Sequence, residues 1–159
     1  MYPTVEPLAL PEGYGQVETT LSWETVRDRL AGSLHYWVAT SRSDGRPHVV
    51  PRWGVWLDDT WFYDGSPRTV HARNLERAPA AVMHLEDGAR AVIVEGESRL
   101  LLPTGDLGER LAVAFGKYHA LGYAPGPSSW DEGGLWGLTP RRVLAWTSYP
   151  RDCTRFRFA

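Results

Sequence analysis

Aromatic and β-branched residues recur along the first half of the chain in short runs that tight turns separate. Residues 34–41 (LHYWVATS) form one such run, and side chains of these types favour β-strands. The Asp-Gly pair within residues 43–47 predicts a hairpin turn, so that residues 48–57 return as a second strand. Residues 61–63 (WFY) follow as a third strand. Three consecutive strands joined in this way describe an antiparallel meander.

The second half of the chain continues the pattern. Four further strands are expected, at residues 80–86, at 91–102, near 143–147 and near 154–158. An Asp-Gly pair at 87–88 joins the first two as a hairpin. Gly96, inside the second of these strands, predicts a bulge at which the sheet bends.

Helical periodicity interrupts the strands at three places. Apolar residues share one face in 23–31, where Ser22 is the expected N-cap, in 69–78, which an Ala-Pro pair ends, and in 104–119. Residues 121–134 form a long loop, of a kind that is either mobile or functional. The expected fold is mainly β with α+β character: a small antiparallel barrel of six to seven strands with two to three helices.

Composition limits the classes of function. A length of 159 residues with 43% hydrophobic content suits one packed domain, expected at residues 21–159 after an N-terminal arm at 1–20. A net charge of −2 argues against binding of nucleic acid or membranes by bulk electrostatics. The single cysteine, Cys153, excludes an internal disulfide and a cysteine metal cluster, and the scattered histidines predict no metal site. The first residues lack a signal-peptide pattern, so a cytoplasmic location is expected.

The stretch from Trp61 to Pro79 has the strongest chemical signal. Its pattern predicts a strand, a tight turn and then a helix start, which offers unpaired N–H groups and the positive end of the helix dipole. Five side chains that bind anions gather within about two helical turns: Ser66, Arg68, Thr69, His71 and Arg73. That combination suits a phosphate. The alternative interpretation is a capped surface helix with solvated arginines, and the spacing is not that of a P-loop.

Five motifs, in order along the chain, resemble those of one family. They are Trp37-Val-Ala-Thr, Asp44-Gly45-Arg-Pro47, Pro51-x-Trp-Gly-Val-Trp56, Arg73-Asn74-Leu75-x-x-x-Pro79 and Val94-Glu95-Gly96-Glu97. The set resembles the pyridoxamine 5′-phosphate oxidase-like proteins, whose fold is the FMN-binding split β-barrel. Within them it looks closest to the actinobacterial branch of flavin- and deazaflavin-dependent oxidoreductases. The resemblance covers roughly residues 20–158.

The resemblance implies a homodimer with two cofactors in grooves between the subunits. The cofactor phosphate would lie against residues 66–73 and its ring along residues 51–53. The full set of cofactor-binding residues expected is Pro51, Arg52, Trp53, Tyr63, Ser66, Arg68, Thr69, His71, Arg73 and Asn74. Many relatives have a lysine where this chain has His71, and a neutral imidazole binds phosphate less strongly than an ammonium does. Arg68 or Arg73 could compensate through a bidentate guanidinium. No catalytic residue is assigned.

Two classes of function follow. The first is an oxidoreductase that passes hydride through a flavin or deazaflavin to or from a small organic substrate. The second is a split-barrel protein without catalysis, with or without a bound cofactor, that acts as a reservoir, sensor or interaction partner. The deazaflavin coenzyme F420 is favoured over FMN, because Arg42, Arg46 and Arg52 could meet its acidic tail and the resembling branch is actinobacterial. The same arginines could equally be solvated hairpin residues.

Overall fold

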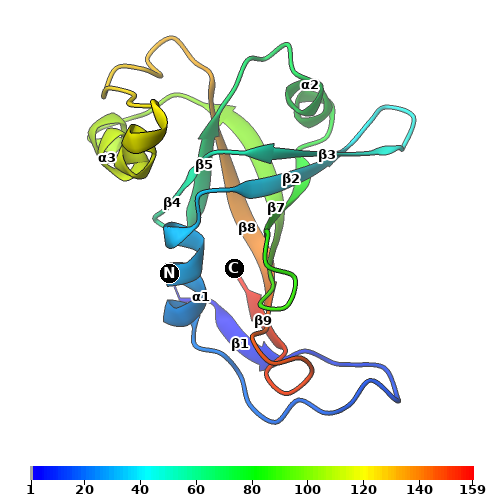
Figure 1. The fold of residues 1–159 in the computed structure, drawn as a ribbon. Helices are drawn as coiled ribbons and strands as arrows, with labels where there is room; N and C mark the ends of the chain where they lie inside the picture. The colour runs from blue at the N-terminus through cyan, green and yellow to red at the C-terminus, as the bar shows by residue number, and fades with distance from the viewer. Residues whose placement is uncertain (1) are drawn as a thin grey trace.

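The computed structural model describes residues 2–159, which form one antiparallel sheet of nine strands (Figure 1). The strands lie in the order β1-β9-β8-β7-β6-β2-β3, and β5 pairs with both β8 and β4. Their bounds are β1 (Thr4–Pro7), β2 (Tyr36–Ser41), β3 (Pro47–Arg52), β4 (Val55–Leu57), β5 (Thr60–Asp64), β6 (Ala80–Leu85), β7 (Val92–Leu101), β8 (Leu135–Ala145) and β9 (Thr154–Arg157).

The long strand β8 organises the sheet. It pairs with β7 along its whole length, while its first half also pairs with β5 and its second half with β9. The strands from β4 through β5, β8, β7, β6 and β2 to β3 therefore form a continuous path. The chain links the two ends of this path through Trp53 and Gly54 alone. Within residues 2–159 no ladder joins β3 to β4, so the sheet is open there.

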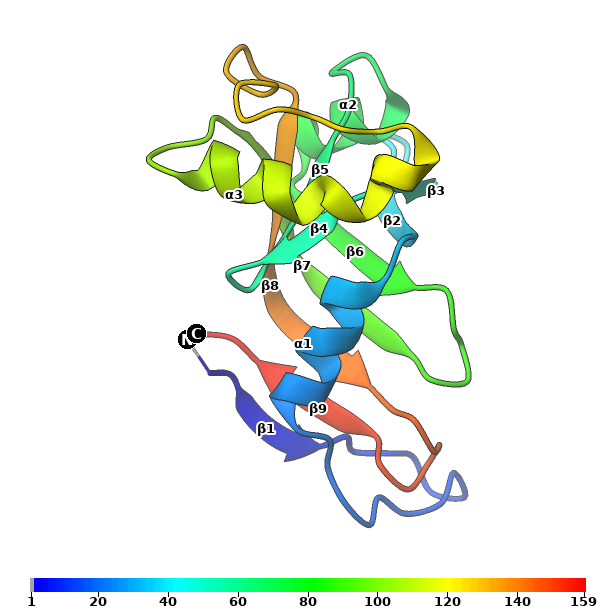
Figure 2. The same cartoon turned by 60° about the vertical axis from the view of Figure 1, so that its left-hand side comes forward.

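Three α-helices pack on the sheet, in agreement with the upper number expected. They are α1 (Trp23–Gly32), α2 (Val70–Arg77) and α3 (Leu107–Ala114), which continues as the 3-10 helix η1 (Phe115–Leu121). The helix α1 begins where predicted, because the Ser22 hydroxyl accepts a hydrogen bond from the Thr25 N–H at 3.2 Å. Figure 2 shows α3 and η1 running across the outside of β4 and β5. None of the helices that the structure describes is long and apolar enough to cross a membrane.

The core has two parts. The larger lies where α1 and α2 cover the sheet and includes stacked rings of Trp61 and Tyr63, whose centroids are 4.2 Å apart. The smaller fills the space between the sheet and the α3–η1 segment, and its buried side chains are Val55, Phe62, Leu111, Phe115, Tyr118, Trp130 and Leu135. Aromatic residues thus fill both parts, as the tryptophan-rich composition suggests.

The predicted strand over residues 48–57 is in fact two strands, β3 and β4, with a break at Gly54. A side chain at Gly54 would collide with the Trp61 indole nitrogen, so only glycine fits. The Tyr118 hydroxyl accepts a hydrogen bond from Gly54 N at 3.0 Å and lies 2.8 Å from Gly54 O. A side chain therefore replaces the ladder partner at this position, which residue pattern alone does not reveal.

The count of nine exceeds the six to seven strands expected, because the break at Gly54 adds β4 and the N-terminal arm adds β1. β8 is a single strand that begins at Leu135 instead of near residue 143 and continues through Gly137 and Pro140. β1 lies within the expected N-terminal arm and pairs with β9, with Thr4 opposite Arg157. The bulge predicted at Gly96 is confirmed by a shift of the β7–β8 register between Glu95 and Gly96. The helix predicted over 104–119 is shorter and tightens into 3-10 geometry at Phe115.

Candidate functional site

The turn before α2 is fixed by its own hydroxyl groups. Thr69 is the N-cap of α2: its Oγ1 accepts from Ala72 N at 3.4 Å and donates to Ser66 O at 2.9 Å. The Ser66 hydroxyl accepts from Arg68 N at 3.2 Å. These bonds hold the turn between β5 and α2 in one shape. The Thr69 hydroxyl is therefore occupied by the turn itself.

The start of α2 is open to an anion. Among the residues that the structure describes, the backbone N–H groups of Val70 and His71 have no acceptor. The first turn of α2 carries no acidic residue, whereas the first turns of α1 and α3 each carry a glutamate. Arg68 and Arg73 are exposed, and neither has an ion pair within residues 2–159. Free N–H groups, the helix dipole and two unpaired guanidinium groups all favour negative charge here.

His71 is buried beneath this turn, with 2% of its surface exposed. Its Nε2 lies 3.4 Å from Thr69 Oγ1. Burial, together with the nearby Arg52 and His48, lowers the pKa of His71 to about 4. At neutral pH the imidazole is thus uncharged, and it contributes a hydrogen bond to the site but no positive charge.

Arg52, at the end of β3, lies directly under the turn. Its Nη2 donates to the backbone carbonyl of Asp64, and a side chain on Gly65 would come within 2.8 Å of the same nitrogen. The Arg52 Nε is buried and has no hydrogen-bond partner in the part of the chain that the structure describes. A buried donor without a partner is costly, so this nitrogen suits an acceptor supplied by a ligand.

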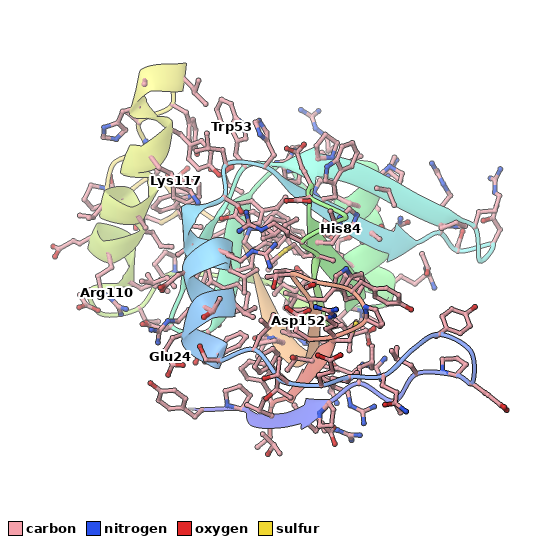
Figure 3. The ribbon with its side chains drawn as sticks, turned by 60° about the horizontal axis from the view of Figure 1, so that its bottom comes forward. Glu24, Trp53, His84, Arg110, Lys117 and Asp152 are labelled. Carbon is pink, nitrogen blue, oxygen red and sulfur yellow. The ribbon has the colours of Figure 1, made fainter. Side chains whose placement is uncertain are left out.

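A pocket of about 310 Å³ opens beside Arg52. Its lining residues are His35, Pro51, Arg52, Trp53, Asp64 and Tyr123. Trp53 stacks on Tyr118 with ring centroids 5.0 Å apart, which holds it between β3 and η1 (Figure 3). The Tyr123 hydroxyl donates a hydrogen bond to the Asp64 carboxylate. Flat rings and a proline on the walls suit a planar ligand, and the volume lies in the range of small-molecule sites.

The structure brings seven of the ten predicted residues to the surface of this region. Pro51, Arg52 and Trp53 line the pocket, and Ser66, Arg68, Thr69 and Arg73 belong to the turn and helix start. His71 lies buried beneath the turn. Two more predicted residues also lie in the interior. Tyr63 is fully buried, with its hydroxyl 2.7 Å from Ser98 Oγ, and Asn74 Nδ2 donates to Thr40 Oγ1 at 2.9 Å. Both therefore lie beneath the site without facing the pocket.

Three pocket residues did not emerge from the sequence. In the sequence Asp64 belongs to a turn, where aspartate is common, and His35 is an isolated histidine at the start of a strand, so neither indicates a site. Tyr123 lies in the 121–134 loop, whose unusual length was the one available signal. Two arginines of the first hairpin were expected near a cofactor tail. Arg46 pairs with Asp44 at 2.8 Å. Arg42 lies near His48, and burial and then the charge of Arg42 are the two causes that lower the pKa of His48.

The sequence model of the family described as pyridoxamine 5′-phosphate oxidase matches residues 22–147. A conserved hypothetical protein from Mycobacterium tuberculosis is similar in structure, with a TM-score of 0.64 and 20% identity over 82% of this chain and 88% of that one. A protein named F420 reductase is similar with a TM-score of 0.57 and 22% identity, over 84% and 98% of the two chains.

Other similar structures have different names. The heme storage protein HutZ from Vibrio cholerae has a TM-score of 0.58 and 18% identity, over 77% of this chain and 93% of that chain. At such identities structural likeness shows a shared fold and no more, because one fold hosts many functions. No curated protein matches the chain.

Proposed function

Because the chain belongs to the pyridoxamine 5′-phosphate oxidase family, we propose that it is an oxidoreductase that uses a flavin or deazaflavin, and that its sheet is the split β-barrel of that family. The observation that carries the proposal is a pocket lined by aromatic rings and a proline, next to the start of α2, whose first turn has no acidic residue. The bound cofactor supplies hydride transfer to or from a small organic substrate, while the protein binds and orients it.

In this proposal the residues divide into two groups. The N–H groups of Val70 and His71, with Arg68 and Arg73, bind the cofactor phosphate. Pro51 and Trp53 contact the ring, and the unpartnered Nε of Arg52 donates a hydrogen bond to it or to its chain. The remaining predicted residues support the site from within: Ser66 and Thr69 shape the turn, and Tyr63 and Asn74 fix β5 and α2 below it.

We also propose a homodimer with the cofactor between subunits. Pro51 is exposed and belongs to two surfaces at once: the pocket, and the outer face that β2 and β3 share. A second copy seated on that face would border the pocket. The outer face also has exposed apolar side chains such as Val49, which is 48% exposed.

The deazaflavin coenzyme F420 is proposed ahead of FMN. Its acidic tail would need positive charge beyond the phosphate site, and Arg42, which has no ion pair among the described residues, could supply it. Arg46 is less suited because Asp44 already pairs with it. A protein named F420 reductase shares the fold, which agrees with this choice without deciding it.

The experiment is equilibrium titration of the purified protein with both cofactors at low and high salt. We expect tighter binding of F420 than of FMN, with an affinity that falls steeply as salt rises. Co-purification of FMN without any binding of F420 would reverse the choice of cofactor. Failure to bind either cofactor would refute the oxidoreductase proposal itself.

The alternative function is a non-catalytic cofactor-binding or cofactor-less protein. One observation favours it: the buried His71 is neutral and adds no charge for a phosphate, where the resemblance implies a lysine. The absorbance spectrum of the protein as purified separates the classes. A flavin or deazaflavin band supports the oxidoreductase. A heme Soret band supports heme storage, the role stated in the name of HutZ. A colourless protein that takes up none of these cofactors supports the cofactor-less alternative.

A further inference from the structure

A second compartment lies on the other side of Asp64 from the pocket already described. Its volume is about 640 Å³, and its walls are the turn at 64–67, Leu100 of β7 and the loop from 123 to 134. Figures 1 and 2 show this loop passing above the ends of β5 and β8. Asp64 and Tyr123 line both cavities, so their hydrogen bond forms the partition between them.

The loop that covers this compartment is held at several points. Trp130 Nε1 and the Tyr123 hydroxyl both donate to Oδ2 of Asp64, the former at 3.4 Å. The Gly65 N–H donates to Gly134 O at 3.1 Å. Trp130 is 2% exposed and packs on Phe115 with ring centroids 5.5 Å apart. These contacts hold the loop over the compartment and define its walls.

The charge of the lining has one sign. Asp64 and Glu132 are carboxylates, and the residues that line the compartment include no lysine, arginine or histidine. Both hydrogen bonds to the Asp64 carboxylate reach Oδ2, and within residues 2–159 no donor reaches Oδ1. Oδ1 of the half-buried Asp64 is not among the buried polar atoms, so a ligand can reach it, and a cationic N–H group would both neutralise the charge and donate a hydrogen bond to it.

The compartment also has an apolar side. Leu100 is 48% exposed on its wall, and the ring of Tyr123 lies at the partition. A lining that combines apolar side chains and carboxylates suits a ligand with a hydrocarbon or aromatic body and one positive end. An aromatic face near the charge adds a cation–π contribution.

We propose that this compartment binds a small organic ammonium compound. Binding itself does not depend on any cofactor. The role of that compound as the substrate, or as a group of the substrate, rests on the proposed function, because the partition places the compartment beside the ring pocket.

The experiment uses three probes of similar size and different charge: benzylammonium, benzyl alcohol and benzoate. Each is titrated into the full-length protein at low salt, and the indole N–H signal of Trp130 is followed by NMR to locate the binding. We expect benzylammonium to bind at least about three-fold more tightly than benzyl alcohol, the size of effect that one solvent-accessible charge pair gives, and benzoate to bind weakest.

Glu132→Gln removes one charge from the lining, and its neighbour Asp131→Asn removes one from an exposed position outside the lining. The first should weaken benzylammonium binding about three-fold and leave benzyl alcohol unchanged, and the second should change neither. Equal affinities for the three probes, or equal changes in benzylammonium affinity for the two substitutions, would overturn the proposal. So would benzylammonium binding that does not shift the Trp130 indole N–H signal.

Measuring cofactor affinity in the same variant, Glu132→Gln, distinguishes the failure of one proposal from the failure of the other. If the protein binds a cofactor but has equal affinity for probes of different charge, only the ammonium site is refuted. If benzylammonium binds as expected and no cofactor does, the site stands and the oxidoreductase proposal fails.

Discussion

His71 determines what the turn at residues 65–69 can offer a ligand. Its imidazole is buried and uncharged at neutral pH, with Arg52 and His48 close enough to lower its pKa further after burial. Positive charge toward an anion must therefore come from exposed groups and from the helix start. Arg68 and Arg73 are the two exposed guanidinium groups at that position.

Replacing one of these groups should weaken cofactor binding. Arg68→Ala removes a charge-assisted hydrogen bond, and we expect a loss of about 1.5 kcal/mol, the lower end of the usual range, because Arg68 is exposed to solvent. Titration calorimetry with F420 and with FMN measures it. Arg99→Ala, on a β7 residue that pairs with Glu97, is the matched control and should leave affinity unchanged. Unchanged affinity in Arg68→Ala would remove this residue from the site.

Stability should depend on pH through His71. Its pKa is about 4 in the folded protein and about 6.5 in the unfolded chain. As pH falls below about 6.5, the unfolded chain takes up a proton that the folded protein does not, so the free energy of unfolding decreases until about pH 4. This residue contributes a loss of up to about 3 kcal/mol. His71→Gln should show a smaller loss between pH 7 and pH 4.5 in urea unfolding.

The control for that experiment is His119→Gln, on an exposed residue of η1. It should retain the pH dependence of the unchanged protein. Parallel curves for His71→Gln and the unchanged protein would show that the imidazole is not held neutral.

Two side chains, Lys117 and Asp64, connect the segment around η1 to the rest of the fold. Lys117 of η1 donates to Ala31 O at 3.1 Å, Ser33 O at 2.6 Å and the Tyr36 hydroxyl at 2.8 Å, which ties η1 to the end of α1. Burial lowers the pKa of Lys117 to about 8. On the other side, Asp64 holds the loop that follows η1. Polar contacts thus hold both η1 and the loop that follows it.

Removing the Tyr123 hydroxyl should show how much the contact between the loop and β5 contributes to the stability of the fold. Tyr123→Phe leaves the half-buried Asp64 carboxylate with the Trp130 N–H alone, and we expect a loss of about 1–2 kcal/mol in the free energy of unfolding. Urea denaturation gives the value, and faster amide exchange in residues 123–134 locates the change. Tyr149→Phe, on a 48% exposed ring whose hydroxyl has no hydrogen bond among the described residues, is the control. Equal stability of the two variants would contradict the anchoring role.

At this scale the sequence predicts some elements well and others poorly, for physical reasons. Helices with a side-chain cap and strands flanked by Asp-Gly turns were predicted within a few residues, because the signals are local. The first half of β8 was missed because its partners, β5 and β7, are distant in sequence and override Gly137 and Pro140. The spacing of residues 66–73 correctly predicted a turn followed by a helix start, and anion binding there stays a prediction. The partition formed by Tyr123 was not predicted, since it depends on where a long loop folds back.

The outer surface of the sheet has two different halves. Around β7, β8, β9 and β1 it carries ion pairs, such as Glu95 with Arg142 and Glu6 with Arg155. On β2 and β3 it is apolar: Trp37 lies opposite Pro51, and Ala39 opposite Val49. Both chain termini lie at the charged end, where β1 pairs with β9. Exposed apolar surface at one end, next to the pocket, is the pattern expected of an interface.

A charge on this apolar half should therefore separate the proposed homodimer. Val49→Asp places a carboxylate on β3 at a residue that is 48% exposed in the single chain, so folding should be retained while association is lost. Sedimentation at micromolar concentration should give a dimer for the unchanged protein and a monomer for the variant. Val113→Asp, on an 80% exposed residue of α3 away from β2 and β3, should remain dimeric. Because Pro51 joins this face to the ring pocket, cofactor affinity should fall with the dimer in Val49→Asp and be retained in Val113→Asp. A folded monomer in the unchanged protein, or a dimer that tolerates Val49→Asp, would remove this face from the site.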